Sequence, residues 1–216
     1  MNRSALFYLI AMTTSLFTAL TPTMSQAIEE PDFAVVKKMG AVEIRQYAPY
    51  VVAEVVVNAN ANDAGNQAFP ILAGYIFGKN KGEKKMAMTA PVIQSTAPVT
   101  QTAAPIKMQM TAPDTQAAVP GGYLVQFVLP KAVSLSTAPE PLDERVKLRE
   151  MPAANWAVIT YSGTWSQSNF DENLGALRAA LKAADIATQG EPVLSRYNGP
   201  FTPWFMRRNE IWLALQ

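Results

Sequence analysis

The side chains of this sequence that can do chemistry are carboxylates and thioethers, because the chain has no histidine and no cysteine. Histidine is the commonest metal ligand and general base, and cysteine supplies the thiolate nucleophile. Their absence excludes Ser-His-Asp triads, Cys-His dyads and zinc sites, so we expect no metal site and no zinc. What remains is catalysis by carboxylates, or no catalysis.

Glu54 is one of two carboxylates that deserve a hypothesis. It interrupts the β-branched run of residues 51–57 and shares a strand face with Val52 and Val56, because alternate residues of a strand point to the same side. It is therefore either a residue of the sheet surface or a charge that points into a cavity. Burial of that charge without a partner would be costly.

Glu210 is the second carboxylate, and it stands beside Arg207 and Arg208 at the start of the last expected strand. An ion pair with a neighbouring arginine is its simplest interpretation. Catalysis by Glu54 or Glu210 would require a second acid or a positioned water beside it, and a raised pKa. Because the sequence shows no such pairing, we expect a protein that is not an enzyme.

A repeated phrase carries the thioethers: residues 85–91 read KMAMTAP and residues 107–113 read KMQMTAP. In an extended strand the two methionines of each copy would point to the same face. Met86 and Met88 would then either line a pocket or fill an irregular core, whereas packing or a loop is favoured for Met108 and Met110. Capture of a soft metal such as Cu(I) is a minor alternative.

The N-terminus predicts export. Arg3 precedes an uncharged run over residues 5–20, and the small residues 25–27 (SQA) follow as a cleavage site, so residues 1–27 form the expected signal peptide. The run is shorter than a membrane span and is interrupted by threonine and serine. We therefore expect a periplasmic or secreted protein that starts at Ile28 and has no membrane span after signal cleavage.

The charge of the chain argues against nucleic-acid binding. The full sequence has 18 basic and 17 acidic residues, and signal cleavage would remove Arg3 and no acid. Nucleic-acid binding rests on an excess of basic charge, which this balance does not provide. The chain is long enough to bury a sizeable core in one domain.

Alternation and helical spacing predict an α+β domain. The expected strands cover residues 33–38, 41–47, 50–57, 123–129, 146–151, 156–161, 191–197 and 210–215, and the expected helices cover residues 63–77 and 170–184. Pro70 requires the first helix to start near Phe69 or to kink there. Ser168 is the expected N-cap of the second helix. Residues 94–105 and 111–120 have no period and are expected to be exposed loops.

The elements also suggest a duplication. Residues 50–57 lead through a polar link into the first helix, residues 156–161 lead likewise into the second, and further strands follow each helix. We therefore expect a pseudo-duplicated unit in which two helices pack against one curved antiparallel sheet.

Six segments in order resemble the SOUL, or haem-binding, family. They are residues 42–47 (VEIRQY), 75–80 (YIFGKN), 86–92 (MAMTAPV), 127–130 (FVLP), 197–200 (YNGP) and 207–212 (RRNEIW). The resemblance covers the chain after the signal peptide and implies one domain over residues 28–216. It implies a distorted antiparallel β-barrel of about eight strands flanked by two helices.

The resemblance also implies a ligand: haem or a similar tetrapyrrole or apolar small molecule, bound in a shallow apolar groove beside the first helix without a histidine ligand. The matching positions are Phe69, Leu72, Tyr75, Ile76, Met86 and Met88, with Lys85 and its neighbours Lys79, Lys81 and Lys84 facing the propionates or forming a solvated loop. In the family's drug-sensing relatives a carboxylate on a comparable strand meets cationic ligands, so Glu210 is a further candidate as a pocket acid.

Two alternatives stay open. One is a carboxylate-using hydrolase or a cationic small-molecule sensor, related to the ligand-binding domains of multidrug regulators. The other is an envelope interaction protein that uses its Ala/Thr/Pro-rich loops. The C-terminal aromatics Phe201, Trp204, Phe205 and Trp212 are core in most proteins, although an exposed part of them would form an interaction patch.

Overall fold

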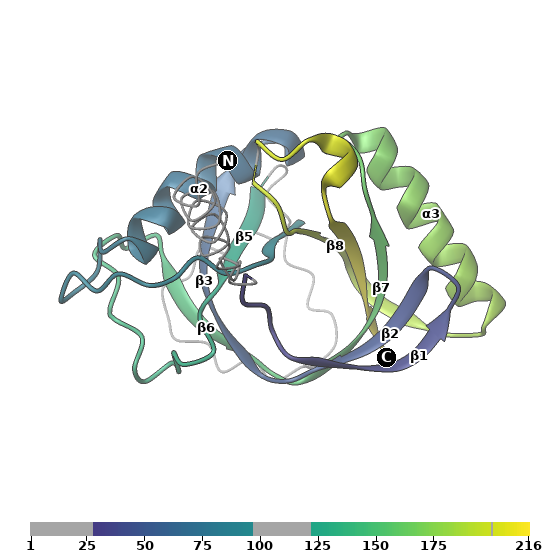
Figure 1. Ribbon diagram of the computed structural model, residues 1–216, viewed down its shortest axis with the longest axis horizontal. Helices are drawn as coiled ribbons and strands as arrows, with labels where there is room; N and C mark the ends of the chain where they lie inside the picture. Colours follow the sequence, from purple (N-terminus) through teal and green to yellow (C-terminus); the bar gives the residue numbers. More distant parts are fainter. Residues whose placement is uncertain (1–27, 97–121, 200) are drawn as a thin grey trace, which may run out of the picture.

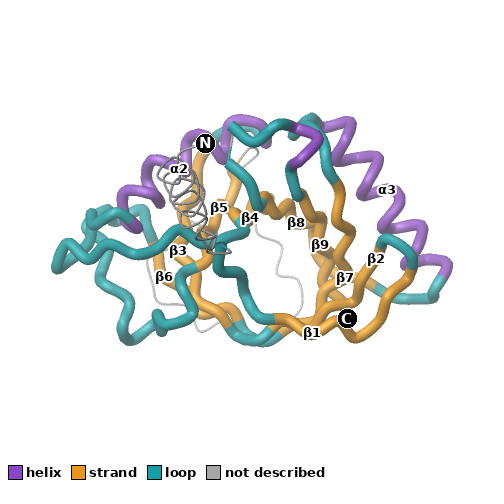
Figure 2. The backbone as a smooth tube through the Cα atoms, in the orientation of Figure 1, coloured by secondary structure: helices purple, strands orange, loops and turns teal. Residues whose placement is uncertain are grey.

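The computed structural model describes residues 28–96, 122–199 and 201–216. The predicted signal peptide and the second methionine phrase, with Met108 and Met110, lie outside these ranges. The described residues form nine strands, two α-helices and one 3-10 helix (Figure 2): β1 (Phe33–Met39), β2 (Val42–Tyr47), β3 (Tyr50–Asn58), α2 (Ala61–Ile76), β4 (Val92–Thr96), β5 (Gly122–Val128), β6 (Lys147–Met151), β7 (Ala154–Tyr161), α3 (Gln167–Ala183), β8 (Thr188–Arg196), η1 (Trp204–Met206) and β9 (Asn209–Leu215). Among these described helices, none has the length and apolarity needed to span a membrane.

All of these strands form one antiparallel sheet in the order β1-β2-β7-β9-β8-β4-β5-β3-β6. The sheet curls into an open half-barrel, and α2 and α3 lie on its outside (Figure 1). The predicted α+β architecture of a distorted antiparallel barrel with two flanking helices is therefore confirmed. Nine strands take part, and the sheet stays open between β1 and β6.

The sheet order confirms the pseudo-duplication. One half runs β3-α2-β4-β5 and the other β7-α3-β8-β9, and the two halves meet where β8 pairs with β4. Residues 48–49 link β2 to β3, and residues 152–153 link β6 to β7. Because β2 pairs with β7 and β6 pairs with β3, each half receives a strand that precedes the other half in the sequence.

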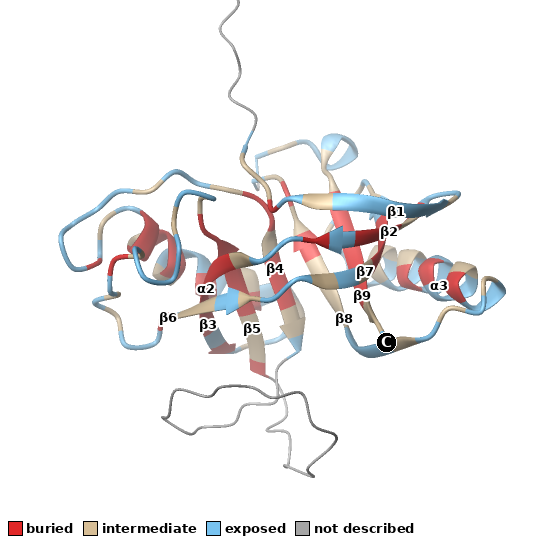
Figure 3. Ribbon diagram, turned by 90° about the horizontal axis from the view of Figure 1, so that it is seen from below, coloured by how far each residue is buried: buried red, intermediate tan, exposed pale blue. Residues whose placement is uncertain are grey.

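Three apolar clusters follow from the alternation of the strands (Figure 3). On the outer face of the sheet α2 packs against β3 and β5, and α3 packs against β7 and β9. The third cluster lies on the inner face and consists of Tyr47, Val52, Ile93, Val128, Val158 and Trp212. Residues of the inner face, from both halves, thus lie together in the hollow of the half-barrel.

Helix α2 is continuous through Pro70, which excludes a start near Phe69, one of the two alternatives that this proline left open. The Asn60 side chain caps the helix, since its Oδ1 accepts a hydrogen bond from the Asp63 amide (3.1 Å) and its Nδ2 donates to the Asp63 carboxylate (2.7 Å). Pro70 is exposed, so the hydrogen bond that it removes lies on the solvent side. The opposite side of the helix is buried, through Ala64, Ala68, Leu72, Ala73, Tyr75 and Ile76.

Helix α3 begins earlier than predicted, and its N-cap is Ser166 instead of Ser168. Ser166 has an extended backbone, and its Oγ accepts a hydrogen bond from the Asn169 amide (3.4 Å). The polar residues before Phe170 carry no helical period, which is why the first turn was missed. Leu174, Leu177 and Leu181 are buried against the sheet, as their spacing predicts.

Strand β4 corrects two further expectations. Residues 94–96 belong to this strand, between β5 and β8, instead of to a loop. The strand is hard to predict from the sequence because Gln94 is polar. The Gln94 side chain is nevertheless buried, and its amide donates a hydrogen bond to the Ala61 carbonyl (2.7 Å). The methionine phrase before β4 is irregular and not a strand, so Met86 and Met88 do not share a strand face.

Candidate functional site

Glu210 lies at the centre of a buried polar network on the inner face of the sheet, and its side chain has no exposed surface. Five side chains of the described residues donate hydrogen bonds to its carboxylate: Arg45 Nη1 (3.1 Å to each oxygen), Arg208 (2.8 Å from Nη2), Thr160 (3.1 Å), Tyr197 (2.8 Å) and Trp212 Nε1 (2.8 Å). A carboxylate offers about four acceptor positions, so these donors saturate it.

The charges of this network are fixed near neutral pH. Burial raises the pKa of the Glu210 carboxyl, but Arg45 and Arg208 outweigh it and hold that pKa below its usual value of 4.5. Burial, and then the charge of Glu210, raise the pKa of Tyr47 to about 12 and raise the pKa of Tyr197 further. Glu210 is therefore a charged acceptor surrounded by cations and neutral hydroxyl donors.

In this structure the carboxylate of Glu210 is therefore occupied by side chains of the protein. The ion pair with a neighbouring arginine is present through Arg208, and Arg45 adds a second cation. Arg45 also pairs with Glu43 (2.8 Å), and Arg208 pairs with Glu30 (2.8 Å). The network joins β2, β9 and the N-terminal segment, and contact of Glu210 with a ligand stays a prediction.

Glu54 occupies the inner face of the other half and is also buried and paired. Gln126 donates to its Oε2 (2.8 Å), and Arg149 lies 2.7 Å from its Oε1. Glu54 thus matches neither of its two interpretations, exposed sheet surface or a charge that points into a cavity: it is a buried charge with a cationic partner. Neither Glu54 nor Glu210 lines the pocket described below, so the structure gives the hydrolase alternative no support at these residues.

The residues predicted on α2 separate into core and surface. Leu72, Tyr75 and Ile76 are at most 1% exposed and belong to the apolar cluster between α2 and the sheet. The Tyr75 hydroxyl donates to the Pro139 carbonyl (2.8 Å), and burial raises its pKa to about 12. Phe69 is 45% exposed and contacts the Phe127 ring edge-on.

The predicted residues after α2 lie on a well-anchored loop. Asn80 is buried and binds both the Tyr75 carbonyl (2.9 Å) and the Lys84 carbonyl (2.8 Å). The Met86 amide donates to the Ile76 carbonyl (2.9 Å), and its side chain packs partly buried against the core of α2. Met88 and Lys85 are exposed. Met86 therefore packs against the protein, whereas Met88 is exposed to solvent.

Phe69 and Met88 flank the same end of strand β5. The Thr89 hydroxyl donates to the Val128 carbonyl, one residue beyond the Phe127 ring that Phe69 contacts. Of the eight predicted site residues, Phe69 is exposed on α2, Met88 and Lys85 are exposed on the loop that follows the helix, and Met86 is partly buried against the α2 core. The structure places Glu210 in the other half of the sheet.

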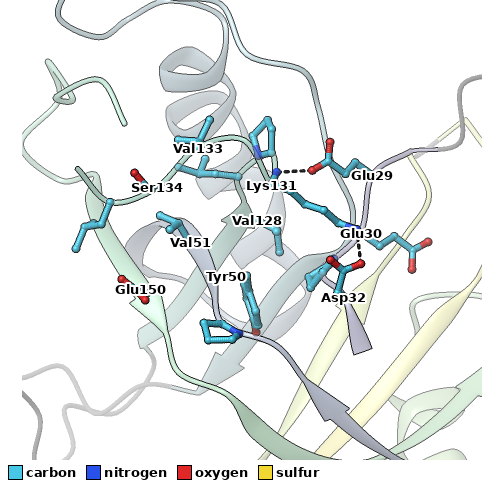
Figure 4. A pocket seen from close by; sticks show the side chains of 15 residues that line it. Glu29, Glu30, Asp32, Tyr50, Val51, Val128, Lys131, Val133, Ser134 and Glu150 are labelled. Carbon is cyan, nitrogen blue, oxygen red and sulfur yellow. Dashed lines mark hydrogen bonds and ion pairs between the residues drawn. The ribbon is translucent and has the colours of Figure 1, made fainter. Parts of the chain in front are cut away.

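A pocket of about 310 Å³ was not anticipated from the sequence (Figure 4). Its apolar wall includes Tyr50, Val51, Val128, Leu129, Val133 and Leu135, and its charged lining consists of Glu29, Glu30, Asp32, Glu150 and Lys131. Glu30 forms an ion pair with Arg208. The Lys131 ammonium forms an ion pair with Asp32, and the Lys131 backbone amide donates a hydrogen bond to Glu29. Negative charge therefore exceeds positive charge around an apolar wall.

Four separate segments build this pocket, which explains why a sequence pattern does not reveal it. Of the residues that line the pocket wall, only those in segment 127–130 (FVLP) are singled out in the sequence, and there only as part of the family resemblance. Over the described ranges of the chain, no cluster of three or more carboxylates is arranged to hold a metal ion.

Comparison with known proteins supports the sequence resemblance. A family model described as SOUL heme-binding protein matches residues 28–214. Heme-binding protein 2 of Homo sapiens is 26% identical over 195 residues, which cover 88% of this chain and 87% of the relative. Heme-binding protein 1 of Mus musculus is 24% identical over 160 residues, which cover 74% of this chain and 75% of the relative.

Solved structures share the fold. An uncharacterized conserved protein from Listeria innocua superimposes with a TM-score of 0.58 at 9% identity, over 81% of this chain and 92% of that one. The C-terminal domain of EcmrR gives a TM-score of 0.54 at 9% identity, over 81% of this chain and 96% of that domain. At this identity the likeness concerns the fold alone.

Proposed function

We propose that this chain, which belongs to the SOUL heme-binding protein family, is an exported binding protein for haem or a similar tetrapyrrole or apolar small ligand, without a histidine ligand. The family match over residues 28–214 is the observation that carries the proposal, since this family supports haem or tetrapyrrole binding. The sequence without histidine supports the mode of ligation. Residues 1–27 read as a signal peptide, which supports export to the periplasm or beyond.

The surface beside α2 suits this ligand better than the pocket does. A tetrapyrrole such as haem combines a broad apolar face with two carboxylates. Phe69 and Met88 offer exposed apolar surface, and Lys79, Lys84 and Lys85 lie on the adjoining loop. The pocket presents an excess of carboxylates, which would repel the propionates. We therefore assign the tetrapyrrole to the α2 surface.

Titration with hemin tests the proposal. The chain from Ile28 to Gln216 should give a saturable change of the Soret band. The double variant Phe69→Ala/Met88→Ala should bind about 30-fold more weakly, since each of the two side chains would lose apolar contact worth about 1 kcal/mol. The matched control is Phe205→Ala/Met206→Ala, which removes an exposed phenylalanine and an exposed methionine elsewhere. Adsorption without saturation, or equal loss in both double variants, would refute the assignment.

The acidic pocket favours a second candidate function, binding of a lipophilic cation. Besides Glu30, its lining holds three carboxylates, Glu29, Asp32 and Glu150, against one lysine, together with an apolar wall, which suits a positive charge on an aromatic body. The likeness to the EcmrR domain is one of fold and adds nothing on the ligand.

Rhodamine 6G, a fluorescent lipophilic cation, is a suitable probe of this candidate. We expect a saturable rise of its anisotropy and about fivefold weaker binding by Glu150→Gln, which corresponds to about 1 kcal/mol for one partly screened charge. Glu172→Gln removes an exposed carboxylate on α3 and serves as the control. If the two variants bind the dye equally well, the pocket is not its site.

A further inference from the structure

A turn of large apolar side chains protrudes between β8 and β9. We call residues 201–206 the aromatic turn; they include the helix η1. The exposed fractions are 99% for Phe201, 57% for Trp204, 60% for Phe205 and 64% for Met206. The turn lies at the top of Figure 1, beside the start of α3. Trp212, the remaining aromatic of this part of the sequence, is buried core.

Backbone hydrogen bonds hold the aromatic turn in its exposed position. The Met206 amide donates to the Pro203 carbonyl (2.9 Å), and the Thr202 amide donates to the Gly199 carbonyl (3.1 Å). The Trp204 carbonyl accepts from the amides of Gly163 (3.0 Å) and Arg207 (3.3 Å). Backbone groups paired within the protein are what entry into an apolar medium requires, because an unpaired group there is costly.

The base of the aromatic turn carries positive charge. The guanidinium groups of Arg207 and Arg196 lie over the Trp165 ring, at 4.1 and 4.8 Å from its centroid. Arg208 follows in the sequence but is paired with Glu30 and Glu210, so the positive charge of the base comes from Arg196 and Arg207. Residues 162–170 and 192–209 contain no aspartate or glutamate, although the start of α2, with Asp63, also approaches this end through Gly65, which lies beside Arg196.

We propose that the aromatic turn inserts into the lipid–water interface of a membrane that contains anionic phospholipids. Tryptophan and phenylalanine partition to this interface, and arginines behind them would lie at the depth of the headgroup phosphates. The aromatic turn protrudes, with apolar side chains at its tip and arginines at its base. This arrangement suits a lipid surface, which can deform around the tip while its phosphates meet the arginines. The domain would then be a peripheral protein that touches the membrane with its β8–β9 end. This inference does not depend on the ligand.

Sedimentation with vesicles tests the proposal on the chain from Ile28 to Gln216, which contains every described element and lacks the apolar leader. We expect binding to vesicles of equal parts phosphatidylcholine and phosphatidylglycerol, and at least tenfold weaker binding to pure phosphatidylcholine. Trp204→Ala/Phe205→Ala should reduce binding to the anionic vesicles at least tenfold. The control Phe77→Ala removes a 55% exposed phenylalanine after α2 and should bind like the wild type.

Brominated phospholipids add a readout of insertion. They should quench part of the wild-type tryptophan fluorescence, and this part should disappear in Trp204→Phe, which keeps an aromatic side chain at the tip. Absence of vesicle binding by the wild type, or equal loss in the Phe77 variant, would overturn the proposal. So would vesicle binding that persists undiminished in Trp204→Ala/Phe205→Ala. Hemin titration should be unchanged in the turn variants, which separates this inference from the proposed function.

Discussion

Replacing Glu210 with alanine is expected to lower the free energy of unfolding by about 3–5 kcal/mol, because the substitution leaves Arg45 and Arg208 as buried cations without their carboxylate. It also leaves the Tyr197 hydroxyl and the Trp212 indole without an acceptor. Urea unfolding at pH 7, followed by tryptophan fluorescence, measures the loss.

The control is Glu191→Ala, an exposed glutamate on the neighbouring strand β8, which should change stability by less than about 0.5 kcal/mol. The effect of the Glu210 substitution also depends on pH. The folded-state pKa of Glu210 lies below its usual value of 4.5, so its stabilisation is complete above about pH 4.5 and is lost as the pH falls further. A loss that is small at pH 7, or that grows in acid, would contradict this role.

Leu72→Ala should destabilise the domain by about 2–5 kcal/mol, because the leucine is fully buried between α2 and the sheet and its truncation leaves a cavity. Thermal or urea unfolding measures this loss. The same substitution at Leu142, which is 60% exposed, is the control and should cost about 0.5 kcal/mol or less.

The experiment also separates two roles of Leu72. The family resemblance places this residue in the ligand groove, whereas its burial makes it core. A core residue predicts a large loss of stability with hemin affinity unchanged under conditions where the variant is folded. A stable variant with weakened hemin binding would favour the groove.

Much of the fold could be predicted from the sequence because it rests on local periodicity. The alternation of β3 and the leucine spacing of α3 each record which side of the element faces the sheet. On α2 the spacing of the large residues gives a wrong buried face. Phe69 falls in helical register with Leu72 and Ile76 but is exposed, whereas the small residues Ala64 and Ala68 are buried against the sheet. Strand β4 was missed since Gln94 is a polar side chain in a buried position.

The candidate sites could not be predicted in the same way, because they join residues that are far apart in the sequence. The arginine that pairs with Glu210 across the sheet, Arg45, lies on β2 near the other end of the chain. The sequence offered Arg207 and Arg208 equally as partners, and the register of β9 selects Arg208. The acidic pocket likewise exists only once its four segments are assembled.

The position of β9 in the interior of the sheet makes the folding of one half of the sheet depend on this strand. This strand, the last of the chain, lies in the interior of the sheet between β7 and β8, and it carries Glu210 and Trp212 into the inner face. Strand β2 forms a local hairpin with β1, but its other partner is β7, and this second pairing is strongly non-local and slow to form. Until β9 has been synthesised, one half of the sheet lacks its middle strand and the charged side chains around Glu210 lack their common acceptor. Loss of a few C-terminal residues would therefore damage the molecule at its core instead of fraying an edge.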